Sequence, residues 1–193
     1  MSRTIELEVY KIEELSEESR RKAFNGFCES SDYYSRKENA ETLEVFEGVF
    51  PIKVTDWSYG NYGNDYINFD TTCEYDIEEL SGLRLSKYLW NNFKSCIYNG
   101  KYYSIFRPDL KGFKYRRSNI ILDTSCVLTG YYIDDEILSP IYSFMKEPDD
   151  RSFYDLMKEC LESWLKACNE DYENYYSMEN FIEVSECNEW EYY

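Results

Sequence analysis

The sequence predicts an α+β fold: a single domain with a small, mostly antiparallel sheet packed with several helices, including a long C-terminal helix. The first observation is the spacing of apolar residues. In some segments they alternate with polar residues, which is typical of strands, and in others they recur every three or four residues, which is typical of helices. The second is that hydrophobic residues make up 43% of 193 residues and aromatics 19%, which distinguishes the chain from a disordered acidic polypeptide. The third is that no internal repeat or linker interrupts it, so we expect one domain over residues 1–193.

The N-terminal part predicts one strand and two helices. Residues 4–10 alternate apolar and acidic side chains, which is typical of a half-buried strand. Ser16 is a favourable N-cap residue and is followed by two glutamates, which predicts a helix that ends near Phe27. Apolar residues spaced so that they share one helical face predict a second helix over residues 38–47.

The middle of the chain predicts a hairpin, a helix and two strands. A turn cluster rich in Gly and Asn separates two extended segments, residues 52–57 and 65–75, and therefore predicts a β-hairpin. An amphipathic pattern predicts a helix over residues 80–96. Asn99-Gly100 is a turn signal, after which we expect strands within residues 102–106 and 118–128.

The C-terminal part is predicted to be mainly helical. A helix over residues 134–146 contains Pro140, which we expect to kink or break it. The longest predicted helix spans residues 153–176.

A short predicted helix and strand end the chain. Ser177 is the expected N-cap of a helix that ends at Cys187, and Asn188 suits its C′ position. Acidic and aromatic residues alternate over residues 189–193, which predicts a closing edge strand.

The distribution of charge limits the possible functions. The chain has 38 Asp+Glu against 21 Lys+Arg, no histidine and a net charge of −17. The acidic C-terminal portion, residues 146–193, holds 14 acids and 4 bases, and no base follows Lys166. Such a surface repels nucleic-acid phosphates and is attracted to basic grooves. We therefore expect no direct nucleic-acid binding and no attachment to anionic membranes.

The cysteines and the N-terminus indicate a reducing location. Seven cysteines are an odd number and form no C-x-x-C pair, which favours free thiols. No signal-peptide pattern and no apolar run of membrane-spanning length occurs. We therefore expect a cytoplasmic protein.

Common catalytic systems are missing from the sequence. Without histidine, the Ser-His-Asp and Cys-His systems and the usual zinc sites are excluded, and glycine-rich nucleotide loops do not occur. A carboxylate-and-metal nuclease or hydrolase is a less favoured alternative, because adjacent acids are expected by chance in so acidic a chain. Its candidate ligands are Asp70 with Glu74 and Asp76, Glu78 with Glu79, Asp123, and Asp134 with Asp135 and Glu136. We expect no enzymatic activity and no cofactor.

One basic cluster interrupts the acidic chain. Its members are Lys111, Lys114, Arg116 and Arg117, interleaved with Phe113 and Tyr115. Such a segment can bind nucleic acid. We favour a solvated loop, or one that pairs with the acidic C-terminal portion, because the field of the whole chain repels phosphates.

The two ends of the chain carry a resemblance to a known family. The segment Ile-Glu-Glu-Leu-Ser-Glu-Glu-Ser-Arg-Arg-Lys-Ala-Phe, residues 12–24, resembles small acidic accessory proteins of bacteriophages and prophages. The resemblance continues at the other end, where a long tyrosine-rich acidic helix is followed by a capped short helix ending in Asn and by an acid–aromatic strand, Asn188-Glu-Trp-Glu-Tyr. The chain departs from that pattern at Ser19, where the family prefers Ala, and ends at Tyr193 without an Asp-Gly turn. Proteins of this kind are similar in character to anti-CRISPR and anti-restriction inhibitors.

The resemblance and the charge together favour a phage-encoded, non-enzymatic inhibitor of a host defence nuclease complex. Its expected partner is a CRISPR effector or another nucleic-acid-binding defence protein, whose basic channel it would block. The candidate contacts are Glu170, Asp171, Tyr172, Glu173, Tyr175, Tyr176, Glu179, Glu183, Glu186, Glu189 and Glu191. One acid per helical turn is spaced about 5.4 Å apart, against about 3.4 Å for phosphates of one DNA strand, so several elements would have to combine their charges. The alternative is a phage accessory protein that regulates a partner without mimicking nucleic acid.

Overall fold

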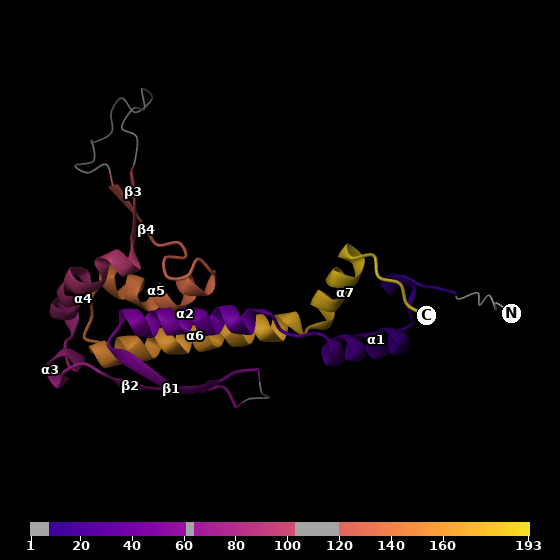
Figure 1. Cartoon of the computed structure of the whole chain (residues 1–193), viewed down its shortest axis with the longest axis horizontal. Helices are drawn as coiled ribbons and strands as arrows, with labels where there is room; N and C mark the ends of the chain where they lie inside the picture. The colour runs from indigo at the N-terminus through magenta and orange to yellow at the C-terminus, as the bar shows by residue number, and fades with distance from the viewer. Residues whose placement is uncertain (1–7, 61–63, 103–119) are drawn as a thin grey trace, which may run out of the picture. The chain divides into compact units, whose positions relative to one another are not determined.

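The computed structural model describes residues 8–60, 64–102 and 120–193 (Figure 1). It confirms the α+β class, with several helices, a long C-terminal helix and antiparallel hairpins. Close contacts divide the chain into two compact units. Unit 1 comprises Met1–Tyr34 and Asn169–Tyr193, and unit 2 comprises Ser35–Cys168. The helix α6 (Phe153–Tyr175) supplies residues to both units.

Unit 1 contains three further short elements, namely η1 (Ile12–Glu14), α1 (Glu17–Ser30) and α7 (Met178–Cys187). Both predicted N-caps are confirmed. The Ser16 hydroxyl accepts a hydrogen bond from the Ser19 N–H at 3.2 Å. The Ser177 hydroxyl accepts one from the Asn180 N–H at 3.1 Å. These bonds satisfy donors that a helix start leaves without an intrahelical partner.

The core of unit 1 consists of aromatic side chains from α1 and α7. Ile12, Phe27 and Phe181 are buried. The Phe181 ring centroid lies 5.4 Å from that of Phe27 and 5.7 Å from that of Phe24. Aromatic pairs at this separation add to the burial of apolar area. The short helices are therefore held by packing against each other.

The two ends of the described chain in unit 1 are joined by one antiparallel bridge. Tyr10 and Tyr192 exchange two backbone hydrogen bonds, each 2.9 Å long. The predicted strand over residues 4–10 is described only from Glu8 onward, and its earlier residues lie outside the described part. The predicted edge strand over residues 189–193 is wrong, because only Tyr192 forms a β-bridge.

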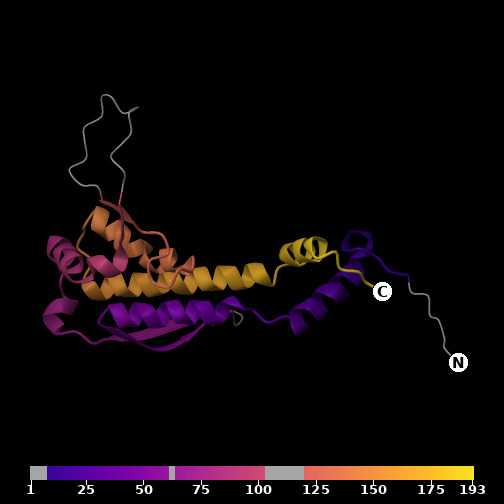
Figure 2. The same cartoon turned by 45° about the horizontal axis from the view of Figure 1, so that its top comes forward.

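Unit 2 is built around two helices, α2 (Ser35–Val49) and the first part of α6, which lie side by side in Figures 1 and 2. The Trp164 indole N–H donates to the Asn39 carbonyl at 3.1 Å. Phe46, Leu161 and Trp164 are fully buried. The helix α2 is longer at both ends than residues 38–47, and it and α6 supply the central core of the unit.

The predicted hairpin is confirmed. The strand β1 (Ile52–Ser58) pairs antiparallel with β2 (Tyr66–Thr71). Its register shifts between Val54 and Asp56. The Trp57 ring packs edge-on against Trp164 with 5.3 Å between the centroids, so the hairpin is packed against α6.

The described residues of unit 2 form three further helices, namely α3 (Tyr75–Glu78), α4 (Gly82–Ile97) and α5 (Ile133–Lys146). The helix α5 continues through Pro140 and is not broken. Proline has no N–H to donate to the carbonyl four residues earlier, which is that of Glu136. The Ser163 hydroxyl donates to that carbonyl at 2.9 Å, so the lost helical bond is replaced from α6.

A second antiparallel pair consists of β3 (Asn99–Tyr102) and β4 (Ile120–Asp123). The predicted turn at Asn99-Gly100 is wrong, because both residues begin β3 and pair with Asp123 and Leu122. The strand predicted over residues 102–106 is described only at its first residue. The strand predicted over residues 118–128 ends at Asp123. The basic cluster Lys111–Arg117 lies outside the described residues.

Within the described residues, no helix is both long and apolar enough to cross a membrane. All seven cysteines are free thiols, as predicted, although only Cys160 and Cys168 are buried.

Candidate functional site

Unit 1 concentrates the negative charge of the chain. It is less than a third of the sequence, yet it holds 16 acids and 5 bases, a net charge of −11 out of −17. The acidic C-terminal portion, residues 146–193, is not a structural unit, because its residues 146–168 belong to unit 2. Packing adds the acids of η1 and α1 to those of the C-terminus. The candidate site is therefore the surface of unit 1, which we name the acidic unit surface.

The helix α7 presents the most regular part of this surface. Glu179, Glu183 and Glu186 follow each other by four and three residues, which places them on one helical face. All three are exposed, whereas Phe181 and Ser185 are buried. The apolar side of α7 packs on α1 and thereby fixes the acidic face toward solvent. No Lys or Arg of the described residues lies within ion-pair distance of these three carboxylates.

The other predicted acids have more varied surroundings. Asp171 is half-buried and accepts a hydrogen bond from the Tyr33 hydroxyl. Glu173 is exposed and accepts one from the Asn169 amide at 3.0 Å. Glu191 forms an ion pair with Lys11 at 3.5 Å. Asp171 therefore has an internal structural role, and it contributes less to the exposed charge than α7 does.

Several cations of unit 1 bind groups of the unit itself. The Lys11 ammonium also donates to the Glu189 carbonyl at 2.8 Å. The Arg20 guanidinium donates to the Ile12 carbonyl at 3.2 Å, and Lys22 pairs with Glu18 at 2.9 Å. These contacts hold helix ends and neighbouring side chains, and they leave the α7 carboxylates without a nearby counter-charge.

A tyrosine cluster lies at the junction of the first and last parts of unit 1. It consists of Tyr33, Tyr34, Tyr172, Tyr175 and Tyr176, with neighbouring ring centroids 4.9–6.4 Å apart. The Tyr175 hydroxyl donates to the Asp32 carbonyl at 3.1 Å, and the Tyr176 hydroxyl to the Ser31 carbonyl at 2.8 Å. Burial raises the pKa of Tyr176 above its usual value.

Three tyrosines that were predicted to contact a partner pack inside unit 1. Tyr172, Tyr175 and Tyr176 are half-buried and fasten the segment after α1. Their contact with a partner stays a prediction. Tyr34, which the sequence analysis missed, is 71% exposed. The adjacent pair Tyr33-Tyr34 in a polar turn was the available signal, since one of two neighbouring tyrosines at a turn commonly remains outside the core.

Two of the carboxylates considered for metal binding, those of Asp134 and Asp135, accept hydrogen bonds from backbone N–H groups. Among the described residues, no group of three or more Cys, Asp or Glu side chains is placed to hold a metal ion. The Asp134 carboxylate accepts hydrogen bonds from the backbone N–H groups of Leu128, Thr129 and Gly130 at 2.7–2.9 Å. Asp135 accepts one from the Cys126 N–H at 2.7 Å. Donors that surround a carboxylate in this way occupy the oxygens that a cation would need.

No protein-family model, curated protein sequence or solved structure matches the chain. Kinship with the phage accessory proteins stays a prediction that rests on the two terminal segments quoted above.

Proposed function

We propose that the acidic unit surface binds a basic nucleic-acid-binding groove of a partner protein and blocks nucleic-acid access to it. In its specific form, the protein is a phage-encoded, non-enzymatic inhibitor of a host defence nuclease complex, similar to anti-CRISPR proteins. The observation that carries the proposal is the net charge of −11 on one folded unit.

Folding makes this charge useful for recognition. The buried face of α7 fixes the backbone that carries the carboxylates, so a partner has to order the glutamate side chains but not the segment itself, and this lowers the cost of association. A concentrated field also accelerates encounter with an oppositely charged surface. The surface competes with nucleic acid through the sign and position of its charge. Its helical spacing is wider than that of phosphates, so it is not a replica of a DNA strand.

Exposed aromatic side chains favour a second candidate, a protein-binding regulator that does not mimic nucleic acid. Tyr34 is 71% exposed, Trp190 38% and Tyr193 93%. Aromatic residues of this kind are frequent energetic centres of protein interfaces. In this case the affinity would depend on the rings more than on the carboxylates.

The test is inhibition of DNA cleavage by a panel of purified RNA-guided effector complexes. The informative variant changes Glu179, Glu183 and Glu186 together to Gln. The matched control changes Glu41, Glu44 and Glu162, exposed acids of unit 2, to Gln. We expect the first variant to inhibit about tenfold less well, because three interfacial charges at about 0.5 kcal/mol or more each correspond to that loss. The control should remain within about twofold.

Salt dependence provides the second measurement. Inhibition should weaken steadily as the KCl concentration rises, because the attraction between exposed charges is screened. Inhibition that is insensitive to salt and to the triple Glu→Gln change would refute the electrostatic mechanism. If Tyr34→Ala instead abolishes binding, the protein is a regulator that binds its partner without mimicking nucleic acid.

A further inference from the structure

The segment around α4 has a charge opposite to that of the rest of the protein. No Asp or Glu occurs between Glu79 and Asp109, although 38 of 193 residues are acidic. The described part of this segment, residues 80–102, contains Arg84, Lys87, Lys94 and Lys101. Unit 2 has a negative net charge of −6 overall, whereas α4 within it carries three cations and no acid.

The helix α4 exposes apolar and basic side chains on the same face. Leu85, Leu89 and Ile97 are fully buried on its inner side. Leu83, Lys87, Trp90 and Lys94 succeed one another by four, three and four residues and therefore share the outer face. Leu83 is 78% exposed and Trp90 is 38% exposed. A tryptophan that is left partly in water beside two lysines is a feature that folding alone does not require.

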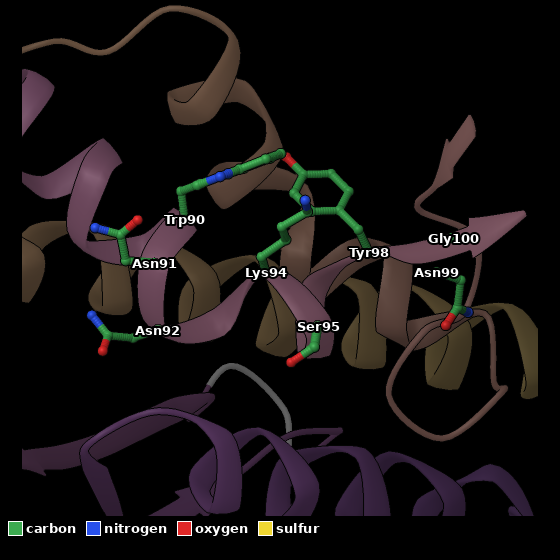
Figure 3. A pocket seen from close by; sticks show the side chains of 8 residues that line it. All are labelled: Trp90, Asn91, Asn92, Lys94, Ser95, Tyr98, Asn99 and Gly100. Carbon is green, nitrogen blue, oxygen red and sulfur yellow. The ribbon is translucent and has the colours of Figure 1, made fainter. Parts of the chain in front are cut away.

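A pocket lies at the C-terminal end of this face, and we name it the α4 pocket. Figure 3 shows the side chains of Trp90, Lys94 and Tyr98 converging there, while Asn92 and Ser95 project away from them. The Lys94 ammonium lies 4.3 Å from the centroid of the Trp90 ring. The rings of Trp90 and Tyr98 are 5.9 Å apart. The pocket has a volume of about 700 Å³, which is within the range of small-molecule sites and large enough for a nucleotide.

The pocket is held in shape by its neighbours. The Tyr98 ring packs against Tyr142 with 5.6 Å between the centroids. The Tyr142 hydroxyl donates to the Ile97 carbonyl at 2.8 Å, at the end of α4. Burial raises the pKa of both tyrosines above the usual value. The aromatic side of the pocket is therefore preformed.

The lining of the pocket is positive and rich in hydrogen-bonding groups. Among the described residues, the lining contains one lysine, the amides of Asn91, Asn92 and Asn99, the Ser95 hydroxyl and no carboxylate. Within the described ranges, no carboxylate lies within ion-pair distance of Arg84, Lys87 or Lys94. These cations are available to an external anion.

We propose that the α4 pocket and the outer face of α4 bind single-stranded nucleic acid. Trp90 offers a partly exposed ring on which a base stacks, Tyr98 supports that ring from the protein side, and Lys87 and Lys94 lie on the same face to contact phosphates. The amides of Asn91 and Asn99 supply donors and acceptors for base edges. Stacking rings combined with a basic track are what sequence-tolerant single-strand binding requires. The carboxylate side chains of an acidic peptide would pair with the lysines but would leave the exposed Trp90 ring without a stacking partner.

This inference goes beyond the proposed function and revises one expectation. The net charge of the whole chain predicted no direct nucleic-acid binding. At about 0.15 M salt, however, exposed charges interact over only about 8 Å, so the nearby cations govern a ligand on α4.

The test is the fluorescence anisotropy of labelled twelve-residue oligo-dT and oligo-U, titrated with the full-length protein at several salt concentrations. We expect Trp90→Ala to weaken binding about tenfold or more, which corresponds to the loss of one stacked base. Trp90→Phe should retain most of the affinity. Lys94→Gln should weaken binding about fivefold and reduce its salt dependence. Lys158→Gln, which removes an exposed lysine of α6, should change the affinity by less than about twofold.

Three results would overturn the proposal. The first is equal affinity of the wild type and Trp90→Ala, provided that circular dichroism shows both to be folded. The second is displacement of the oligonucleotide by polyglutamate at an equal concentration of charges, because α4 would then be a surface for acidic peptides. The third is failure of oligonucleotide binding at millimolar protein.

Discussion

The backbone N–H of Trp190 donates to the carbonyl of Ser185 at 3.0 Å, and this bond closes the last turn of α7. The N–H of Glu189 donates to the Glu186 carbonyl at 3.1 Å. The two bonds form a Schellman motif, whose C′ residue adopts the left-handed conformation. That residue is Glu189, with φ of 53°, whereas the sequence predicted Asn188, which has φ of −94°. The motif turns the chain away from α7 and directs Tyr192 to Tyr10.

Replacing Glu189 by Gly should stabilise the protein by about 1 kcal/mol, because a left-handed conformation costs a residue with a Cβ about 1–2 kcal/mol. The contact from Lys11 to the Glu189 backbone carbonyl does not depend on the side chain. Urea unfolding followed by circular dichroism measures the change. Glu189→Gln removes the same charge but keeps the Cβ and is the control. Equal stability of the two variants would show that charge, rather than backbone conformation, matters at this position.

Asp134→Asn should destabilise the protein by about 2–4 kcal/mol, because Asp134 organises the loop before α5 from a fully buried position. Its carboxylate accepts three backbone N–H bonds and the hydroxyls of Thr42 and Thr129, at 3.1 Å and 2.7 Å. The amide N–H₂ of asparagine accepts no hydrogen bond, so it would either leave backbone N–H groups unsatisfied or force the threonine hydroxyls to reverse their hydrogen bonds. Thermal unfolding gives the size of the effect.

Thr42→Val is the control for this prediction. It removes one of the five donors and keeps the side-chain shape, so it should cost about 1 kcal/mol. A cost of Asp134→Asn no larger than that of Thr42→Val would contradict the role assigned to the carboxylate.

The start of α6 should make stability depend on pH. The Asp155 carboxylate accepts bonds from the hydroxyl and the N–H of Ser152 at 2.7 and 3.1 Å, in a capping box. These bonds hold the pKa of Asp155 below its usual value. A carboxyl whose pKa is lower in the folded state stabilises the fold fully above its unfolded pKa of about 3.9, and this contribution is lost as the pH falls through the folded pKa.

Asp155→Asn should therefore lower the melting temperature by about 2–4 °C at pH 7, as expected for the loss of about 1 kcal/mol of capping. The difference from the wild type should shrink as the pH falls below about 4. Asp150→Asn removes the same charge outside the capping box and should show no such convergence. A difference that is constant from pH 7 to pH 2 would contradict the assignment.

Local features were predicted well because local sequence controls them. The amphipathic pattern over residues 80–96 became α4, Gly82–Ile97. The caps at Ser16 and Ser177 depend on a hydroxyl and an N–H three residues later, so their spacing along the chain is sufficient information. The β1–β2 hairpin followed from two extended segments and the turn between them.

Features that depend on distant partners were not predicted. Asn99-Gly100 is a turn signal, but backbone pairing with Asp123 and Leu122 places both residues in β3. Pro140 is expected to disrupt a helix, but the Ser163 hydroxyl replaces the missing bond. Trp90 was not singled out as a binding residue. The helical pattern alone did not reveal that it would stay partly exposed beside Lys94 and near Tyr98.

The sequence by itself determined the helices, the α+β class and the sign of the charge, because spacing and composition are properties of the chain. Only the tertiary structure decided which charges belong together. Contacts such as Lys11 with Glu191 combine the first and last segments into one unit with a net charge of −11. Packing of Leu85 and Leu89 turns the opposite, basic face of α4 outward. Such contacts link residues far apart in the chain, and no periodicity along the sequence encodes them.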